Sequence, residues 1–440
     1  MDTPICDFVR VYASSGTARL HMPGHKGAGP LGMEQLDITE ISGADSLYEA
    51  NGIIRRSEEN ASALFGCPTF YSTEGSSQCI RAMLYLVSLH AKGRPVIAAA
   101  RNIHKTFLTA AALLDLDVRW IYPPEGSSYL SCPLEEKSLE AFLQRERPTA
   151  LYITSPDYLG NISDIQSISR VCHKNNVLLL VDNAHGAYLR FLGPSAHPMD
   201  LGADLCCDSA HKTLPVLTGG AYLHISETAP AVFRQRAKDA LALFGSTSPS
   251  YLILQSLDAA NAYLADGYTH RLTEFAKEVE DLKSRLAAKG WDILPGEPLK
   301  VTIRAKSSGY TGTELAELLR RHNVECEFAD PDFLVLMLSP ENRTDTLTLP
   351  EQIMGAIPQQ PPILMAPPPF HRCEAVMSIR EAIFSPGCSL SVDDCVGKVL
   401  IAPSVGCPPA VPILICGERI DEAAAARFRY YGIKECTVLE

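Results

Sequence analysis

The architecture of this chain follows from the run Leu178-Leu179-Leu180-Val181-Asp182-Asn183-Ala184-His185-Gly186, in which consecutive apolar residues end at an aspartate. Thirty residues after Asp182 lies Lys212, within Ser209-Ala210-His211-Lys212-Thr213-Leu214-Pro215. A second strand-like run, 203–207, precedes this lysine. Ligand-binding groups collect at the carboxyl ends of parallel strands, so Asp182 and Lys212 are expected at one edge of a parallel sheet.

A lysine and an aspartate are the two residue types that enzymes use to bind the aldehyde and the ring nitrogen of pyridoxal 5'-phosphate. A lysine amine forms a Schiff base with the aldehyde of that cofactor, and a carboxylate that faces the pyridine nitrogen favours its protonated, electron-accepting form. Taken singly, each residue favours a simpler interpretation, Lys212 as a surface lysine and Asp182 as a strand-end cap, since most Lys and Asp residues are solvated. Because each follows a strand-like run, the pair together predicts a pyridoxal phosphate enzyme.

Composition narrows the class of protein further. A chain of 440 residues with 46% hydrophobic content can bury a large core in two or more domains. The formal net charge is −12 and no Lys/Arg cluster stands out, which argues against nucleic-acid and membrane partners and favours a small-molecule substrate. The chain shows neither an apolar stretch of about 20 residues nor a signal pattern, which predicts a cytoplasmic protein.

The cysteines are scattered through the chain. There are 14 of them and none forms a C-x-x-C pair. In a cytoplasmic protein such cysteines are usually small buried hydrophobes, so neither a disulfide nor a metal site is predicted.

Short β-like runs alternate with helical patterns through the first half of the chain. This alternation predicts an α/β fold with a mostly parallel sheet and helices on both faces. After Gly75, apolar residues recur at helical spacing, which predicts an amphipathic helix with Ser76 and Ser77 in its first turn. The predicted strands are 69–73, 96–100, 118–122, 150–154, 177–182, 203–207 and 220–224, and the helical apolar residues are Ile80, Met83, Leu84 and Val87.

The sequence of the second half of the chain predicts smaller domains. A long helical segment over 251–289 is followed by a β-α-β-β pattern over 299–338, and a proline-rich stretch, 357–369, reads as a linker or an extended crossing segment. The tail contains its own apolar runs, 399–403 and 411–416, and should be folded. The predicted boundaries are an N-terminal arm (1–50), a cofactor-binding large domain (51–290), a small α/β domain (291–356), a linker (357–372) and a C-terminal domain (373–440).

A phosphate group needs backbone N–H donors and hydroxyls at the N-terminus of a helix. Gly75-Ser76-Ser77 lies between a predicted strand and a predicted helix and meets that need, although such a run is also an ordinary helix cap. Ser209 and His211 flank Lys212 and are expected to reach the same phosphate. His104, which follows the strand 96–100, is expected to stack on the cofactor ring or else to be a polar loop residue, and the small Ala184 leaves room on the other face.

At this point the chain resembles the Orn/Lys/Arg decarboxylase family, in its short form without an N-terminal receiver-like domain. The resemblance covers essentially the whole chain, with the motifs in the family's order. It implies fold type I with smaller α+β C-terminal domains. The segments that carry it are Leu20-His21-Met22-Pro23-Gly24-His25-Lys26-Gly27, Thr73-Glu74-Gly75-Ser76-Ser77, Arg101-Asn102-Ile103-His104-Lys105, Thr154-Ser155-Pro156-Asp157-Tyr158-Leu159-Gly160, the two segments around Asp182 and Lys212, Ser248-Pro249-Ser250-Tyr251-Leu252, and Cys416-Gly417-Glu418.

The resemblance also implies roles for individual residues. Lys212, Asp182, His104 and His211 are the implied catalytic residues, and Thr247 is implied to reach the phosphate of a neighbouring subunit in a homodimer with shared sites. Glu418 is implied to lie near the cationic end of a basic substrate. The implied cofactor-binding set is Lys212, Asp182, Ala184, His185, His104, Gly75, Ser76, Ser77, Ser209, His211 and Thr247.

Three departures from the family pattern concern the substrate more than the cofactor. Glu74 stands where the family usually has Asn, Cys407-Pro408-Pro409-Ala410 replaces a Tyr-Pro-Pro-Gly run, and Cys416 replaces the proline of Pro-Gly-Glu. The predicted reaction is decarboxylation of arginine, lysine or ornithine, with arginine favoured, in polyamine-related metabolism. The alternatives are an aminotransferase or lyase on the same fold and a non-catalytic homologue that binds pyridoxal phosphate.

The first prediction concerns the lysine. Borohydride reduction of the loaded protein should fix the cofactor on Lys212, because no other lysine follows a comparable Ser-x-His pattern. Lys212→Ala should retain some cofactor through the phosphate-binding residues and lose turnover. Peptide mapping by mass spectrometry checks the labelled site, and a label on a different lysine contradicts the assignment.

Overall fold

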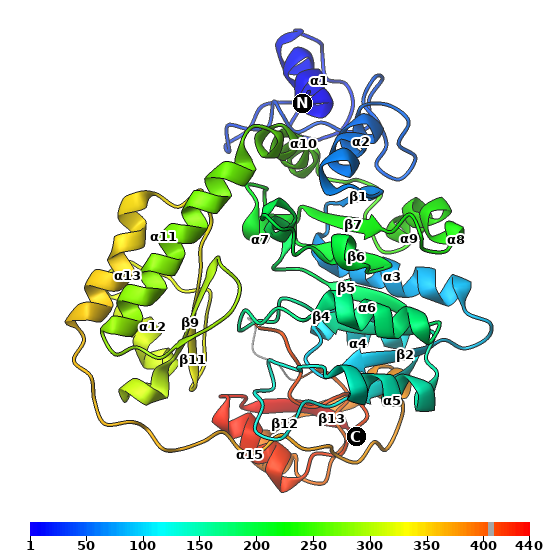
Figure 1. Cartoon of the computed structure of the whole chain (residues 1–440). Helices are drawn as coiled ribbons and strands as arrows, with labels where there is room; N and C mark the ends of the chain where they lie inside the picture. Colours follow the sequence, from blue (N-terminus) through cyan, green and yellow to red (C-terminus); the bar gives the residue numbers. More distant parts are fainter. Residues whose placement is uncertain (404–408) are drawn as a thin grey trace. The chain divides into compact units, whose positions relative to one another are not determined.

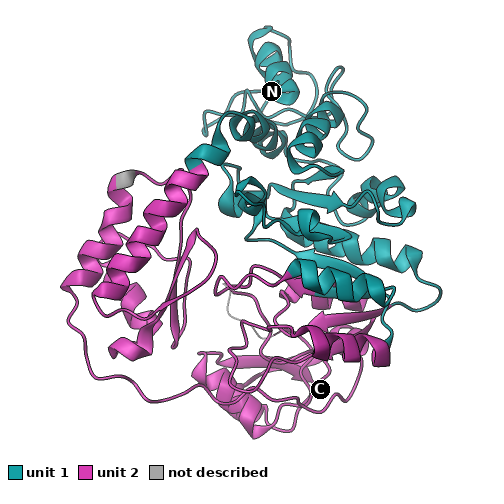
Figure 2. Cartoon of the chain, in the orientation of Figure 1, with its two compact units in different colours: residues 1–95, 147–152, 165–271 teal, residues 96–146, 153–164, 272–440 magenta. Residues whose placement is uncertain are grey.

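The computed structural model of the chain describes residues 1–403 and 409–440 and divides into two compact units (Figure 1, Figure 2). Unit 1 comprises residues 1–95, 147–152 and 165–271, and unit 2 comprises residues 96–146, 153–164 and 272–440. Cys407 and Pro408 of the altered tail motif lie outside the described residues. The domain boundaries expected from the sequence stay predictions.

Unit 1 is built on strands that follow the order β1-β7-β6-β5 across the sheet. Strands β5 and β6 are parallel, whereas β7 runs against both β6 and β1. The elements of unit 1 are α1 (Pro4–Ser14), α2 (Ile53–Phe65), β1 (Thr69–Ser72), α3 (Gly75–His90), α6 (Ile165–Lys174), β5 (Leu178–Asp182), η1 (Ala187–Phe191), η2 (Pro198–Leu201), β6 (Leu205–Asp208), α7 (Ala210–Thr213), β7 (Ala221–Ile225), α8 (Ala231–Gln235), α9 (Ala237–Ala242) and α10 (Tyr251–Ala265).

The predicted helix after Gly75 is confirmed as α3. Its residues Ile80, Met83, Leu84 and Val87 are all buried and form the face that packs on β6 and β7. Burying four such side chains stabilises the fold by roughly 1.5–3 kcal/mol each. The packing fixes where the N-terminus of α3 lies relative to the ends of these strands.

The N-terminal arm is tied to unit 1 by a buried carboxylate. Asp258 on α10 accepts hydrogen bonds from the backbone N–H groups of Ile5 (3.0 Å) and Cys6 (2.9 Å), and from the Ser57 hydroxyl (2.6 Å). The first turn of a helix has N–H groups without intrahelical partners. Asp258 therefore caps α1 and joins it to α2 and α10.

The helical segment predicted over 251–289 is interrupted in the structure. Helix α10 ends at Ala265 and α11 (Tyr268–Ala288) begins three residues later. Gly267 between them has φ +68°, a left-handed conformation that favours glycine and breaks the helix. Periodicity alone did not reveal this break, since the apolar pattern continues on both sides of it.

Unit 2 contains the parallel pair β2–β3 and a separate sheet in the order β10-β11-β9-β8. The β-α-β-β pattern predicted over 299–338 is confirmed by β9, α12, β10 and β11. Strand β4 (Ala150–Thr154) runs from unit 1 into unit 2. The elements of unit 2 are β2 (Val96–Ala100), α4 (Lys105–Leu113), β3 (Asp117–Ile121), α5 (Glu136–Glu146), most of α11, β8 (Ile293–Leu294), β9 (Lys300–Arg304), η3 (Ala305–Ser308), α12 (Gly312–Arg320), β10 (Phe328–Ala329), β11 (Phe333–Met337), α13 (Thr344–Ala356), α14 (Ile379–Ile383), β12 (Gly387–Ser391), η4 (Val392–Asp394), α15 (Glu422–Tyr430) and β13 (Glu435–Leu439).

The predicted α/β architecture is confirmed at the level of its elements. The runs 96–100 and 150–154 match β2 and β4 residue for residue, and the other predicted strands are shifted by one or two residues. The tail has a core of its own, in which Leu400, Ile413 and Leu414 from the predicted apolar runs pack with α15 and β13. Within the described part of the chain, no helix combines the length and apolarity that crossing a membrane requires.

The cysteines behave as the sequence predicts. Those that the structure describes are buried, apart from the half-buried Cys326 and the exposed Cys388. Burial raises the pKa of many of these thiols, for example that of Cys172 to about 12. They therefore act mainly as small apolar side chains.

Candidate active site

Asp182 occupies the carboxyl end of β5 in unit 1, as predicted. Its Oδ2 accepts a hydrogen bond from the Tyr152 hydroxyl (3.0 Å), and its Oδ1 accepts from the Ala184 N–H (3.2 Å) and the Cys207 thiol (3.7 Å). The side chain is buried. Burial raises the pKa of Asp182, while the positive charge of Lys212 and these hydrogen bonds oppose that rise.

Lys212 lies on α7, the short turn that follows β6. Its Nζ is 3.1 Å from Nε2 of His185, which comes three residues after Asp182. The amine is therefore held beside an imidazole that can accept or return a proton. The positive charge of Lys212 lowers the pKa of Asp182 and so favours the ionised carboxylate.

Asp208, at the carboxyl end of β6, is hydrogen-bonded to residues from β7 and from the segments that follow β5. Its Oδ2 accepts N–H donors from His197 and His224, each at 3.0 Å, and its Oδ1 accepts from the Asn183 amide at 2.7 Å. All four side chains are fully buried. Burial raises the pKa of Asp208, but the two histidines outweigh that effect and hold the pKa below its usual range.

The predicted phosphate-binding residues gather at the N-terminus of α3. The Ser209 hydroxyl donates to the Ser76 hydroxyl at 2.8 Å, and Ser77 follows in the same helical turn. Gly75 has φ +69°, and a Cβ built there would meet nothing within 4 Å. Two facing hydroxyls thus border open space at a helix N-terminus, which suits an anion.

Two further predicted residues of unit 1 have different surroundings. Nδ1 of His211 lies 2.9 Å from the Gly220 carbonyl oxygen, and burial lowers the pKa of this imidazole. Thr247 is exposed in the loop between α9 and α10. The structure thus brings Gly75, Ser76, Ser209, Asp182, Ala184, His185 and Lys212 together in unit 1, and the role of Thr247 toward a second subunit stays a prediction.

This set of residues fits pyridoxal phosphate. A buried carboxylate is available for the ring nitrogen, an amine for the aldehyde, and a hydroxyl pair at a helix N-terminus for the phosphate. The open space at Gly75 leaves room for the phosphate oxygens. Each of these groups meets one chemical requirement of the cofactor.

His104 belongs to unit 2 and follows β2. It is the N-cap of α4, where its Nδ1 accepts a hydrogen bond from the Thr106 N–H at 3.2 Å and lies 2.9 Å from the Thr106 hydroxyl. This cap fixes the orientation of the ring and leaves the proton of the neutral imidazole on Nε2. Stacking of this ring on the cofactor stays a prediction.

Glu418 is buried in unit 2, and both of its carboxylate oxygens have partners. Oε2 accepts from the Ile415 N–H at 2.9 Å, Oε1 accepts from the Tyr122 hydroxyl at 3.3 Å, and Nη2 of Arg101 lies 4.0 Å from Oε2. Glu418 therefore stabilises its own turn in this structure. Its role toward a substrate stays a prediction.

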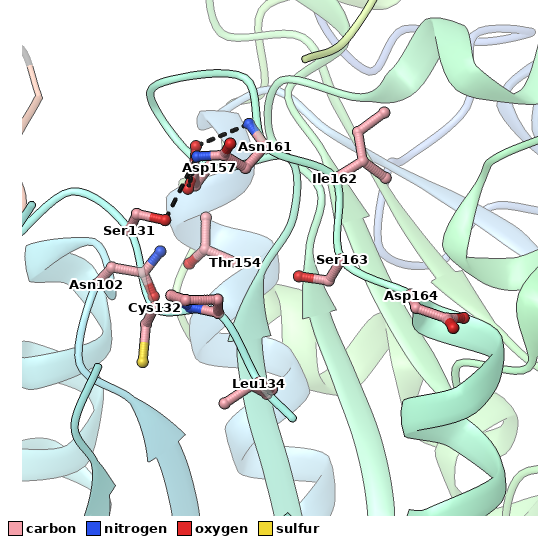
Figure 3. A pocket seen from close by; sticks show the side chains of 11 residues that line it. Asn102, Ser131, Cys132, Leu134, Thr154, Asp157, Asn161, Ile162, Ser163 and Asp164 are labelled. Atoms are coloured by element: carbon pink, nitrogen blue, oxygen red, sulfur yellow. Dashed lines mark hydrogen bonds between the residues drawn. The ribbon is translucent and has the colours of Figure 1, made fainter. Parts of the chain in front are cut away.

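A cavity of about 310 Å³ lies in unit 2, at the carboxyl end of β4 and beyond that of β2 (Figure 3). Asn102 Oδ1 and Thr154 Oγ1 in its wall are buried acceptors without a hydrogen-bond partner among the described residues. The Asn161 side-chain amide donates to Asp157 at 2.8 Å and to the Ser131 hydroxyl at 3.4 Å, and burial raises the pKa of Asp157 (Figure 3). The cavity is lined by Asn102, Ser131, Cys132, Pro133, Leu134, Thr154, Asp157, Asn161, Ile162, Ser163 and Asp164.

Sequence reasoning did not assign a role to Tyr152, Asp208, Asn102 or Thr154. Alternation along a strand places Tyr152 and Thr154 on the same face of β4, a signal that was available in the sequence. The partners of Asp208 come from segments far apart in the chain. No local pattern indicates them.

The fold and the site define a fold type I pyridoxal phosphate enzyme. A model of the Orn/Lys/Arg decarboxylase major domain matches residues 3–304, which is more than half of the chain. The chain belongs to the Orn/Lys/Arg decarboxylase family. Members of this family are pyridoxal phosphate-dependent amino-acid decarboxylases, so the predicted class of enzyme and the predicted cofactor are confirmed.

Individual relatives support this assignment over nearly the whole chain. An arginine decarboxylase of Halalkalibacterium halodurans is 30% identical and covers 97% of this chain and 93% of its own. An arginine decarboxylase of Bacillus subtilis is 29% identical, with 96% and 92% covered. A lysine decarboxylase of Francisella novicida, at 16% identity, has the same fold, with a TM-score of 0.76 over 100% of this chain and 81% of that one.

The second prediction tests Asp182. Asp182→Asn should retain the cofactor but lose most of the catalytic rate, because an amide cannot keep the ring nitrogen protonated. The expected fall in kcat is about a hundredfold or more, in the range of other electrostatic contributions to catalysis. Cofactor absorbance together with steady-state kinetics checks this, and near wild-type turnover would assign the pyridine nitrogen to a different residue.

Proposed function

We propose that the chain decarboxylates a basic amino acid, and arginine in particular, to the corresponding amine and CO2. The observation that carries this proposal is the group formed by the buried Asp182, Lys212 and the Ser76–Ser209 hydroxyl pair within unit 1. The two relatives of 29–30% identity that span almost the entire chain and bear the name arginine decarboxylase support the choice of arginine.

The cofactor, when bound, supplies an acceptor for the electrons that remain after CO2 departs. Asp182 holds the proton on the ring nitrogen, with Tyr152 and the Ala184 N–H orienting its carboxylate. Lys212 and His185 share a proton at Nζ and Nε2 and are placed to return it to the substrate carbon. His211, with its lowered pKa, contributes hydrogen-bonding capacity without a second positive charge.

The cationic end of the substrate needs acceptors. A guanidinium presents five donors in a planar fork, and burying it without acceptors or a counter-charge is costly. Unit 2 offers the Glu418 carboxylate, and separately the unpartnered oxygens of Asn102 and Thr154 beside the buried Asp157. We assign Glu418 to the cationic group of the substrate.

The reaction is tested directly with purified, cofactor-loaded protein. Arginine, lysine and ornithine are supplied separately, and the amine and CO2 are measured. Release of agmatine with one equivalent of CO2 supports the proposal. Formation of a keto acid, or no reaction with any of the three, contradicts it.

The third prediction concerns Glu418. Removing one partner of a buried charge pair costs about 3–5 kcal/mol, so Glu418→Gln should reduce kcat/KM for basic substrates by about two to four orders of magnitude. A matched control is Glu374→Gln, since Glu374 is an exposed residue nearby that pairs with Arg419. The control should keep full activity. Unchanged kinetics in a folded Glu418→Gln protein would remove Glu418 from the substrate site.

We also propose a homodimer in which Thr247 of one subunit reaches the phosphate site of the other. The exposure of Thr247 in the α9–α10 loop is compatible with this role. The fourth prediction uses complementation between Lys212→Ala and Thr247→Arg, each inactive alone. Co-refolded dimers should regain about a quarter of wild-type activity, because half of them contain one intact site. Absence of recovery despite mixed dimers, detected by native mass spectrometry, contradicts shared sites.

A further inference from the structure

Three side chains of different chemistry converge where the proline-rich segment meets α15. Nε2 of His371 lies 2.6 Å from Oδ2 of Asp421, and Sγ of Cys373 lies 3.5 Å from that nitrogen and 3.8 Å from that oxygen. All three belong to unit 2. A nitrogen, a sulfur and an oxygen atom therefore face one point.

The geometry differs from that of a catalytic relay. In a nucleophile–histidine–carboxylate relay the two ring nitrogens bind different partners. Here the same nitrogen, Nε2, faces both Cys373 and Asp421, so the ring does not bridge them. Convergence of three donor atoms on one point is instead the arrangement that a metal ion requires.

The separations match a tetrahedral zinc-type ion. Bonds of about 2.0–2.3 Å at tetrahedral angles place ligand atoms roughly 3.3–3.8 Å apart. The two distances from Cys373 Sγ already lie in this range. The His371–Asp421 distance is that of a hydrogen bond, so an ion would have to replace the shared proton and move these two atoms apart.

Burial and charge favour the same interpretation. The Cys373 residue is 5% exposed, whereas the side chains of His371 and Asp421 are 34% and 46% exposed, which gives an ion a route of entry and leaves a fourth position for water. Burial and the carboxylates of Asp421 and Glu418 raise the pKa of the Cys373 thiol, and Arg427, whose Nη2 lies 3.9 Å from Sγ, only partly offsets that rise. A bound divalent ion supplies the further positive charge that deprotonates a coordinating thiol. A divalent ion with one thiolate and one carboxylate has no net charge, so Arg427 is not repelled.

A second cluster of similar composition lacks these properties. His197, Asp208 and His224 are fully buried, and both rings already donate to one oxygen of Asp208. The other oxygen accepts from Asn183. That cluster is a satisfied structural network with no route for an ion.

We propose that His371, Cys373 and Asp421 bind a zinc-type divalent ion, with water as the fourth ligand. Asp421 is the N-cap of α15, and residues 374–376 pair with residues 417–419 by backbone hydrogen bonds. The ion therefore clamps the end of the proline-rich segment against α15 and the turn that carries Glu418. Metal binding and folding are coupled at such sites, so the ion stabilises this part of unit 2. The proposal is independent of the substrate.

The fifth prediction uses cobalt(II) as a probe of the full, reduced chain. One equivalent of Co²⁺ should produce a thiolate-to-cobalt charge-transfer band and the visible bands of a tetrahedral ion, and Zn²⁺ should displace it. Cys373→Ser should abolish the charge-transfer band. His371→Asn should weaken binding by at least about 100-fold, since even residues outside the coordination shell contribute 10–100-fold.

Two variants make this test specific. Asp421→Asn preserves the N-cap of α15, because asparagine caps as well as aspartate, so weaker metal binding in this folded variant reflects the lost ligand. Cys388→Ser removes an exposed thiol of the same region and should leave the band intact. Zn²⁺ should raise the unfolding temperature of the wild type and of Cys388→Ser, but not that of Cys373→Ser or His371→Asn.

Any of three results overturns the proposal. These are a wild type without a cobalt–thiolate band, a band that survives in Cys373→Ser, and a band that disappears in Cys388→Ser. Because His371 is partly exposed, His371→Asn should fold normally even if Cys373→Ser does not. Unchanged Co²⁺ affinity in His371→Asn contradicts the site on its own.

Discussion

The geometry of the groups that we propose to bind the cofactor depends on the buried carboxylate of Asp208. Asn183, the residue after Asp182, donates to Oδ1 of Asp208, and His197 and His224 both donate to Oδ2 of Asp208. Asp208 itself precedes Ser209 and Lys212 by one and four residues. The carboxylate of Asp208 therefore links the segment after β5 to β6 and β7, and both of its oxygens accept hydrogen bonds. A buried charge without such partners would be strongly destabilising, so the network specifies one arrangement of these elements.

Some buried charges elsewhere in the described part of the chain have partners of opposite charge. In unit 2, Nζ of Lys300 lies 2.7 Å from Oε1 of Glu297. Nζ of Lys306 lies 2.8 Å from Oδ1 of Asp332, and the same oxygen accepts a hydrogen bond from the Tyr430 hydroxyl. Pairs of this kind contribute little net stability, because desolvation offsets their attraction, but losing one partner is costly. They favour one packing arrangement over others in the smaller sheet and the C-terminal region. Glu418 and Arg101 form another buried pair of opposite charge, with 4.0 Å between Oε2 of Glu418 and Nη2 of Arg101.

Much of the local structure was predictable because apolar spacing and strand-end residues are local signals. The strands β2 and β4, the helix α3 and the position of Asp182 at the end of β5 all follow from such patterns. The break at Gly267 was not predicted, because a left-handed residue leaves the periodicity on both sides unchanged. The partners of Asp208 and the convergence of His371, Cys373 and Asp421 were also not predictable. They join residues separated by up to 50 positions, and no spacing rule relates them.

The sequence by itself determined the order of most strands and helices and the family, and it predicted the residues that would serve the cofactor. These properties follow from side-chain chemistry and from periodicity along a short stretch of chain. Only the tertiary structure decided that Tyr152 and Cys207 orient Asp182, that His185 contacts the Lys212 amine, and that both oxygens of Glu418 already have partners. The physical reason is that a buried polar atom must find a hydrogen-bond partner, and the fold decides which distant segment supplies it.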